Sequence, residues 1–159
     1  MKVIMIKKCV ALFSLALVLN NGWAQDKNPY DETANAKADV QAALKVAKAE
    51  NKTALIVFGG NWCGDCKVLD MEMHHGDLAK LVKDRLVVVK VDVGRFDKNL
   101  DVANQYGKLL KNGVPSVALV RADGSVVYQT DGGELADARK MGRDGITQFF
   151  VAMLEKVKK

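Results

Sequence analysis

Two cysteines separated by two residues are the part of this chain best suited to chemistry. Cys63 and Cys66 lie in the motif Trp-Cys-Gly-Asp-Cys, shortly after the apolar run 54–58. Such a pair can close a small, reversible disulfide. If a strand leads Cys63 into the first turn of a helix, unsatisfied backbone N–H groups and the helix dipole lower the pKa of its thiol. The spacing therefore predicts thiol–disulfide exchange, in which a thiolate attacks a disulfide.

The first 24 residues are typical of an export signal. Lys2, Lys7 and Lys8 precede the apolar run 10–19, and the sequence Gly-Trp-Ala offers a cleavage site that ends at Ala24. We expect cleavage near Ala24 and a periplasmic or secreted protein. A retained N-terminal membrane anchor is the alternative, although the apolar run is short for a membrane span.

Removal of this signal changes the cysteine and charge counts of the chain. It takes away Cys9 and three lysines, which leaves Cys63 and Cys66 alone and lowers the net charge from +5 to +2. So small a charge gives no reason to expect a nucleic-acid partner. A purely structural bridge is the alternative to redox chemistry, but a loop this short restricts the unfolded chain little. The pair therefore favours a redox function in an oxidising compartment.

Hydrophobic periodicity predicts the elements that position the pair. Residues 25–34 are polar and read as a flexible lead-in to a single domain, 35–159. Predicted helices cover about 35–50, 64–73, a short segment capped by Asp77, 98–106 and 144–157; predicted strands cover 53–58, 86–93, 116–121 and 125–130. Strands joined by helices pair in parallel, and the last two strands form an antiparallel hairpin. The fold class is therefore α/β, with a central mixed β-sheet flanked by helices in a three-layer sandwich.

This order resembles the thioredoxin family over about residues 40–156. The motif Trp62-Cys63-Gly64-Asp65-Cys66 follows the first core strand, and Val114-Pro115 precedes the hairpin. The resemblance implies a thioredoxin fold in which Cys63 attacks the substrate disulfide and Cys66 resolves the mixed disulfide. It also implies that the Val114–Pro115 bond is cis, which an X-Pro bond tolerates far better than other peptide bonds, and that the backbone of Val114 pairs with substrate.

The resemblance also predicts the composition of the site. The redox-active disulfide Cys63–Cys66 would serve without a cofactor. The residues expected to contact substrate are Trp62, Gly64, Asp65, Val114 and Pro115.

Three departures from the family pattern bear on this site. Asp65 replaces the proline usual between the cysteines, and a negative charge there disfavours a thiolate. The position of the buried aspartate that many thioredoxins carry is held here by Val57. Lys90 matches the lysine that usually accompanies that aspartate, so Lys90 either lacks its partner or reaches solvent. Residues 132–141 form an added segment. We expect Glu134 to Met141 to form a short helix, either beside the active-site edge, where it could restrict substrate choice, or as a surface elaboration far from the cysteines.

A zinc site built from the cysteines with His74 and His75 is a competing interpretation. Adjacent histidines on a helix point about 100° apart, so we expect no metal here. We predict a thiol–disulfide oxidoreductase of the cell envelope that reduces protein or peptide disulfides, acts as a monomer and is recharged by a membrane electron donor. The alternative is a non-catalytic binding module whose groove holds partner peptides. The direction of electron flow depends on the reduction potential, which a sequence does not give.

Overall fold

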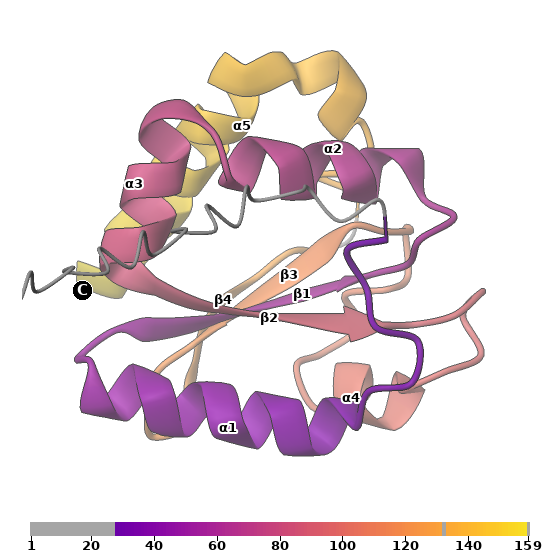
Figure 1. Ribbon diagram of the computed structural model, residues 1–159, viewed down its shortest axis with the longest axis horizontal. Helices are drawn as coiled ribbons and strands as arrows, with labels where there is room; N and C mark the ends of the chain where they lie inside the picture. The colour runs from indigo at the N-terminus through magenta and orange to yellow at the C-terminus, as the bar shows by residue number, and fades with distance from the viewer. Residues whose placement is uncertain (1–27, 132, 159) are drawn as a thin grey trace, which may run out of the picture.

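The computed structural model describes residues 28–131 and 133–158 (Figure 1). The predicted export signal and its cleavage near Ala24 lie outside these residues. Within them, no helix is long and apolar enough to cross a membrane. The elements are α1 (Ala36–Ala49), β1 (Thr53–Gly59), α2 (Gly64–Met73), α3 (Gly76–Arg85), β2 (Leu86–Asp92), α4 (Leu100–Asn104), β3 (Ser116–Val120), β4 (Val126–Gln129), α5 (Ala138–Glu155) and a short 3₁₀ helix (Lys156–Lys158).

The four strands form one mixed sheet in the order β2-β1-β3-β4. β1 pairs parallel to β2 and antiparallel to β3, and β3 pairs antiparallel to β4. The predicted mixed sheet with a hairpin at one edge is therefore confirmed. β1 is buried along its whole length, because it has a strand on each side and helices over each face. Its almost entirely apolar sequence suits that environment.

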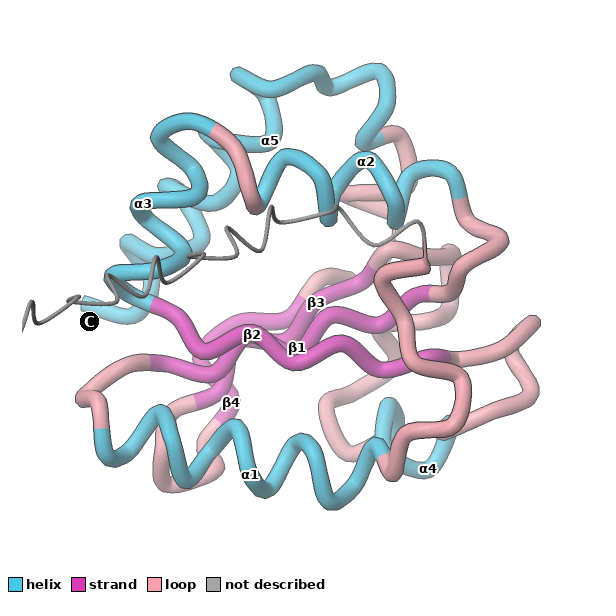
Figure 2. Tube along the Cα trace, in the orientation of Figure 1, coloured by secondary structure: helices cyan, strands magenta, loops and turns pink. Residues whose placement is uncertain are grey.

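Helices cover both faces of the sheet, which gives the three expected layers. α1 and α4 lie over one face, and α2, α3 and α5 lie over the other (Figures 1 and 2). The buried apolar side chains form two clusters. Both cysteines belong to the cluster that includes α1, whereas Leu69 and Met73 of α2 pack with α5 in the other. α2 therefore joins the two cores, and its first turn is the part that carries the cysteines.

Local sequence explains where several elements begin and turn. The side chain of Asn35 accepts a hydrogen bond from the amide of Ala38 at 3.1 Å and so caps α1. Cys63 occupies the same position at the start of α2. Gly124 has a φ of 89° and supplies the left-handed residue of the β3–β4 turn, a conformation that costs glycine little.

Three helices differ from the sequence prediction. α3 begins at Gly76 with His75 as its N-cap and no side-chain cap hydrogen bond, so Asp77 lies in its first turn and the prediction that Asp77 caps it is wrong. α4 is shorter than the predicted helix 98–106, because Asn99 has a left-handed backbone with a φ of 51° immediately before it. Residues 134–137 form a turn, so the prediction of a helix from Glu134 is wrong; α5 begins only at Ala138. Gly142, with φ 65° and ψ 178°, then kinks α5 and separates its first turn from the rest of the helix.

One residue of the lead-in that the sequence predicts to be flexible is packed into the domain, whereas most of its described neighbours are exposed. The Tyr30 side chain is only 2% exposed. In Figure 1 this segment crosses from the level of α2 to the level of α1. The prediction of flexibility is therefore wrong at Tyr30, because the burial of its large aromatic ring offsets the entropy lost by ordering the adjacent backbone.

Candidate active site: a cysteine pair at the start of α2

The cysteine pair lies where β1 passes into α2. Cys63 is the N-cap of α2, and the amide N–H of Cys66 donates a hydrogen bond to its Sγ at 3.1 Å. The two cysteines are joined by a disulfide. Cys63 is 6% exposed and Cys66 is fully buried. In the reduced protein, the Cys66 amide and the helix dipole would stabilise a thiolate on Cys63, which is also the more accessible of the two sulfurs.

The loop before β3 lies against the pair. The Val114–Pro115 peptide bond is cis. The carbonyl oxygen of Val114 is 3.6 Å from Cys63 Sγ. The structure therefore brings together three of the residues singled out from the sequence, although they are separated by more than fifty positions in the chain.

Trp62 is turned toward the loop that follows β2. Its side chain is 45% exposed, and its indole N–H donates a hydrogen bond to the carbonyl oxygen of Gly94 at 2.5 Å. The ring of Phe96 meets it edge-on at 5.9 Å, and the guanidinium of Arg95 lies 5.6 Å from its centroid. Trp62 and Phe96 thus form an exposed aromatic surface next to Cys63.

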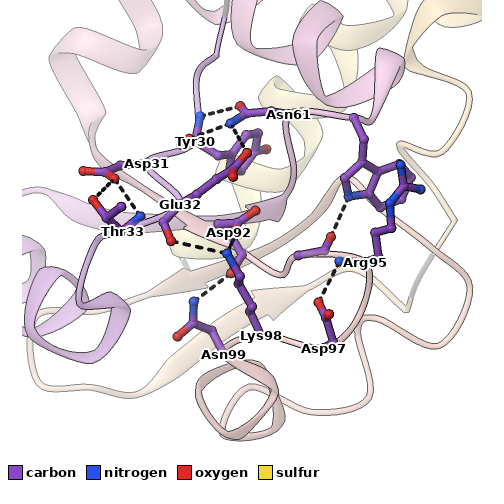
Figure 3. Close-up of polar contacts among 12 residues, drawn as sticks. Tyr30, Asp31, Glu32, Thr33, Asn61, Asp92, Arg95, Asp97, Lys98 and Asn99 are labelled. Atoms are coloured by element: carbon purple, nitrogen blue, oxygen red, sulfur yellow. Dashed lines mark hydrogen bonds and ion pairs between the residues drawn. The ribbon is translucent and has the colours of Figure 1, made fainter.

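The N-terminal segment reaches the site through Tyr30 and Asn61. The Asn61 side chain accepts a hydrogen bond from the Tyr30 amide at 3.0 Å and donates one to the Tyr30 carbonyl oxygen at 2.8 Å. Figure 3 shows Asn61 directed toward this backbone. A Cβ added to Gly59 would lie 2.6 Å from Tyr30 Cζ and 2.9 Å from Cys66 Sγ. The phenol ring and the Cys66 sulfur are therefore packed around the same glycine.

The charge of the Tyr30 phenol is strongly disfavoured in this position. Burial, reinforced by the carboxylates of Asp70 and Asp92, raises the pKa of Tyr30 well above its ordinary value of 10.0. Tyr30 is therefore a neutral side chain at physiological pH. It was not singled out from the sequence, where an aromatic residue in a polar segment was the one available signal.

Asp65 is buried and paired, which revises its expected role. Arg139 of α5 donates to both carboxylate oxygens, from Nε to Oδ1 at 3.2 Å and from Nη2 to Oδ2 at 3.0 Å, and its amide N–H donates to Oδ1 at 3.0 Å. Burial acts to raise the pKa of Asp65, but the hydrogen bonds and charge of Arg139 outweigh it and hold that pKa below the ordinary value of 3.8. The carboxylate thus faces α5, and the expectation that it contacts substrate is not supported by its geometry.

The added segment before α5 lies beside the active-site motif, as one of the two interpretations of the sequence held. It is anchored there by Leu135 and Ala138, which are fully buried, as well as by Arg139. Leu135 and Ala138 of this segment are consequently part of the core.

Lys90 has a carboxylate partner, so the expectation that it lacks one is wrong. Val57 on β1 is buried and lies opposite Lys90 in the parallel register. The carboxylate comes from Asp70, on α2, which forms an ion pair with the Lys90 ammonium. The acid is thus supplied by the helix that covers the strand.

The described residues contain no cluster of three or more His, Cys, Asp or Glu side chains that could hold a metal. The rings of His74 and His75 instead contact carbonyl oxygens of α2, those of Asp70 and Met71, at 2.7 and 2.6 Å.

The fold and the site define a protein with a redox-capable cysteine pair on a thioredoxin fold. A family model described as thioredoxin-like matches residues 35–122. The chain belongs to this thioredoxin-like family.

Similar proteins include both thioredoxins and a disulphide isomerase. The crystal structure of a disulphide isomerase from Xylella fastidiosa Temecula1 is 45% identical, with a TM-score of 0.77, over 79% of this chain and 96% of that one. Thioredoxin of Bacillus subtilis (strain 168) is 32% identical over 97 residues, 60% of this chain and 85% of that protein. Thioredoxin-T of Drosophila melanogaster is 34% identical over 73 residues, and the chain spans 41% of its length. These relatives support thiol–disulfide oxidoreductase activity.

Tyr30 and Arg139 both lie outside the matched residues 35–122. Neither had a local sequence pattern that marked it. Each becomes part of the site only because the chain folds back on the cysteine motif.

Proposed function

We propose that this chain is a thiol–disulfide oxidoreductase of the cell envelope that reduces protein disulfides through Cys63 and Cys66. The observation that carries the proposal is the position of Cys63 at the N-cap of α2, where the Cys66 amide donates a hydrogen bond to its sulfur. This arrangement favours a thiolate on the more exposed cysteine. The buried Cys66 sulfur lies where it can resolve a mixed disulfide.

The reaction begins from the dithiol. The Cys63 thiolate attacks one sulfur of the substrate disulfide, so that a Cys63–substrate disulfide forms and the other substrate sulfur leaves as a thiolate. Cys66 then loses its proton and attacks Cys63 Sγ, which closes the Cys63–Cys66 disulfide and releases the second substrate sulfur. Two electrons pass to the substrate, whose two thiolates take up protons. A dithiol donor returns the protein to its reduced state.

Four residues around Cys63 are suited to hold a substrate peptide. Gly64 and Trp62 are exposed on either side of it in sequence, and the cis Val114–Pro115 bond lies beside its sulfur. The proline cannot donate a hydrogen bond, so the backbone of Val114 remains available to an extended peptide. An extended segment that carries a disulfide would thus lie between Trp62 and Val114.

The proposed location follows from the N-terminal sequence. A basic start, an apolar run and a small-residue site support export and cleavage near Ala24. In the envelope, a membrane-bound dithiol donor would supply the electrons. Expression of the full chain, cell fractionation and the mass of the recovered protein test this part: retention in the cytoplasm at full mass would contradict it.

The activity is tested by insulin reduction with dithiothreitol as the electron source. We expect the wild-type protein to accelerate reduction, Cys63→Ser to abolish the acceleration, and Cys66→Ser to accumulate a Cys63-linked mixed disulfide. A folded wild-type protein that binds peptides but does not accelerate reduction would favour the binding-module alternative. Mixed disulfides trapped by Cys63→Ser, and not by Cys66→Ser, would reverse the assigned roles.

The direction of electron flow needs a separate measurement. The relative from Xylella fastidiosa is a disulphide isomerase, so refolding of a scrambled disulfide protein should be compared with insulin reduction. The reduction potential of the Cys63–Cys66 pair should also be measured. A value near that of strongly reducing dithiols supports the reductase proposal, and a much more oxidising value contradicts it.

A further inference from the structure

The contact between Arg139 and Asp65 places a positive charge beside the attacking cysteine. A Cβ added to Gly64 would lie 3.4 Å from the guanidinium carbon of Arg139. The guanidinium therefore lies next to Gly64, the exposed residue that directly follows Cys63. The two charged side chains approach from different helices, and Asp65 is 74 residues away in sequence.

Asp65 also completes the start of α5. The N-cap of that helix, Asp137, makes no side-chain cap hydrogen bond. The amide of Arg139, in the first turn, instead donates to the Asp65 carboxylate at 3.0 Å. A carboxylate from α2 thus stabilises an amide that α5 leaves without an intrahelical partner. This contact fixes where the Arg139 side chain can lie.

The net charge at position 65 matters because it affects the stability of a thiolate on Cys63. A carboxylate two residues after Cys63 opposes a negative charge on its sulfur. A guanidinium paired with that carboxylate returns the local charge to nearly zero. The N–H groups and dipole of α2 are then free to stabilise the thiolate.

We propose that Arg139 is a positioning residue for the cysteine pair: it holds Asp65 in place and cancels its charge, so that Cys63 ionises as if a neutral residue stood between the cysteines. The consequence for catalysis rests on the proposed function, whereas the effect on Cys63 does not.

The same helix offers a matched control. Arg143 pairs with Glu72, which lies seven residues after Asp65 on α2, through Nε and Oε2 at 2.8 Å. The two pairs have similar exposure, with side chains 65% and 11% exposed for Arg139 and Asp65 and 60% and 8% for Arg143 and Glu72. They differ in their distance along α2 from Cys63.

The other ionisable groups near the cysteines and Arg139 are the same in all variants. Tyr30 packs with Cys66 around Gly59 and is faced by the carboxylates of Asp70 on α2 and Asp92 on β2. Lys90 on β2 pairs with Asp70, and Asp137 lies near Arg139 at the start of α5. The loop after β2 adds Arg95, which lies over Trp62. Differences between the variants below therefore report the charges at positions 65 and 139.

The test is the rate at which iodoacetamide alkylates Cys63 in the reduced protein, followed by mass spectrometry across pH. We expect Arg139→Gln to slow alkylation about threefold at pH values below the thiol midpoint, which corresponds to half a pKa unit. Arg143→Gln should match the wild type. Arg139→Lys retains the charge and should recover most of the rate, and Asp65→Asn/Arg139→Gln should return to the wild-type rate. In glutathione buffers, Arg139→Gln should also favour the disulfide, because its reduced form is less stabilised.

Two outcomes would overturn the inference: an unchanged pH profile in Arg139→Gln, or an equal slowing in Arg139→Gln and Arg143→Gln. Urea unfolding of each variant identifies any that do not fold, in which case the lysine variant and the double variant still decide. Insulin reduction by the wild-type protein is measured separately. A wild type without that activity would refute the proposed function and leave the alkylation comparison intact.

Discussion

Replacement of Tyr30 by alanine should destabilise the domain strongly. The ring is 2% exposed and packs with Cys66 around Gly59. Truncation of a buried aromatic side chain to alanine costs about 3–5 kcal/mol. Domains of this size have a total free energy of unfolding of about 5–15 kcal/mol, so the loss would be a large share of the whole.

Urea unfolding of the oxidised protein, followed by circular dichroism, measures this loss. Tyr30→Phe keeps the aromatic ring, so its free energy of unfolding should fall much less than that of Tyr30→Ala. Asn61→Ala removes two hydrogen bonds to the Tyr30 backbone and should cost about 1–3 kcal/mol, since each bond contributes about 0.5–1.5 kcal/mol.

A second measurement links Tyr30 to the site. In the reduced Cys63→Ser background, Tyr30→Ala should increase alkylation of Cys66, because loss of the ring opens the core beside Gly59, where the Cys66 sulfur also packs. A loss below about 1 kcal/mol in Tyr30→Ala, with Cys66 still protected, would show that the ring is not part of the core and refute this reasoning.

Three further predictions concern the surroundings of the pair. Trp62 is the one tryptophan beyond the predicted signal, so its emission should report the cysteines and be dimmer in the oxidised form; equal emission from both forms would contradict this. The folded-state pKa of Tyr30 is raised, so its contribution to stability is complete below about pH 10 and is lost as the pH rises further. Tyr30→Phe should therefore lose less stability than the wild type between neutral pH and pH values above about 10, as measured by urea unfolding, and parallel losses would count against the assignment. Asp70→Asn should leave Lys90 without its carboxylate and cost about 1–2 kcal/mol in thermal or urea unfolding, less than a fully buried pair because both side chains retain some exposure; no measurable loss would mean that the ion pair contributes nothing.

The sequence predicted those elements whose causes are local. The apolar run of β1, the amphipathic spacing of α1 and the turn of the hairpin each depend on a few adjacent residues. The position of Cys63 at the start of α2 belongs to the same class, because a buried strand and a helix flank it directly. Patterns of this kind are visible before any tertiary contact forms.

The remaining features depend on contacts between distant segments. Nothing adjacent to Asp65 indicates that its charge is matched by Arg139. Lys90 was expected to lack a partner because the strand position that usually carries the acid holds Val57, whereas Asp70 on the covering helix takes that role. Tyr30 looked like part of a polar segment, and only its burial shows otherwise.

The Asp65–Arg139 contact has an evolutionary consequence. If Arg139 sets the ionisation of Cys63 as proposed, two chains that share the motif Trp-Cys-Gly-Asp-Cys should differ in redox behaviour when the residue of α5 that contacts Asp65 differs. Positions 65 and 139 should therefore covary among relatives: an arginine lost at 139 should be accompanied by loss of the acid at 65. Comparisons confined to residues 35–122 would miss this covariation, because one of its two members lies beyond them.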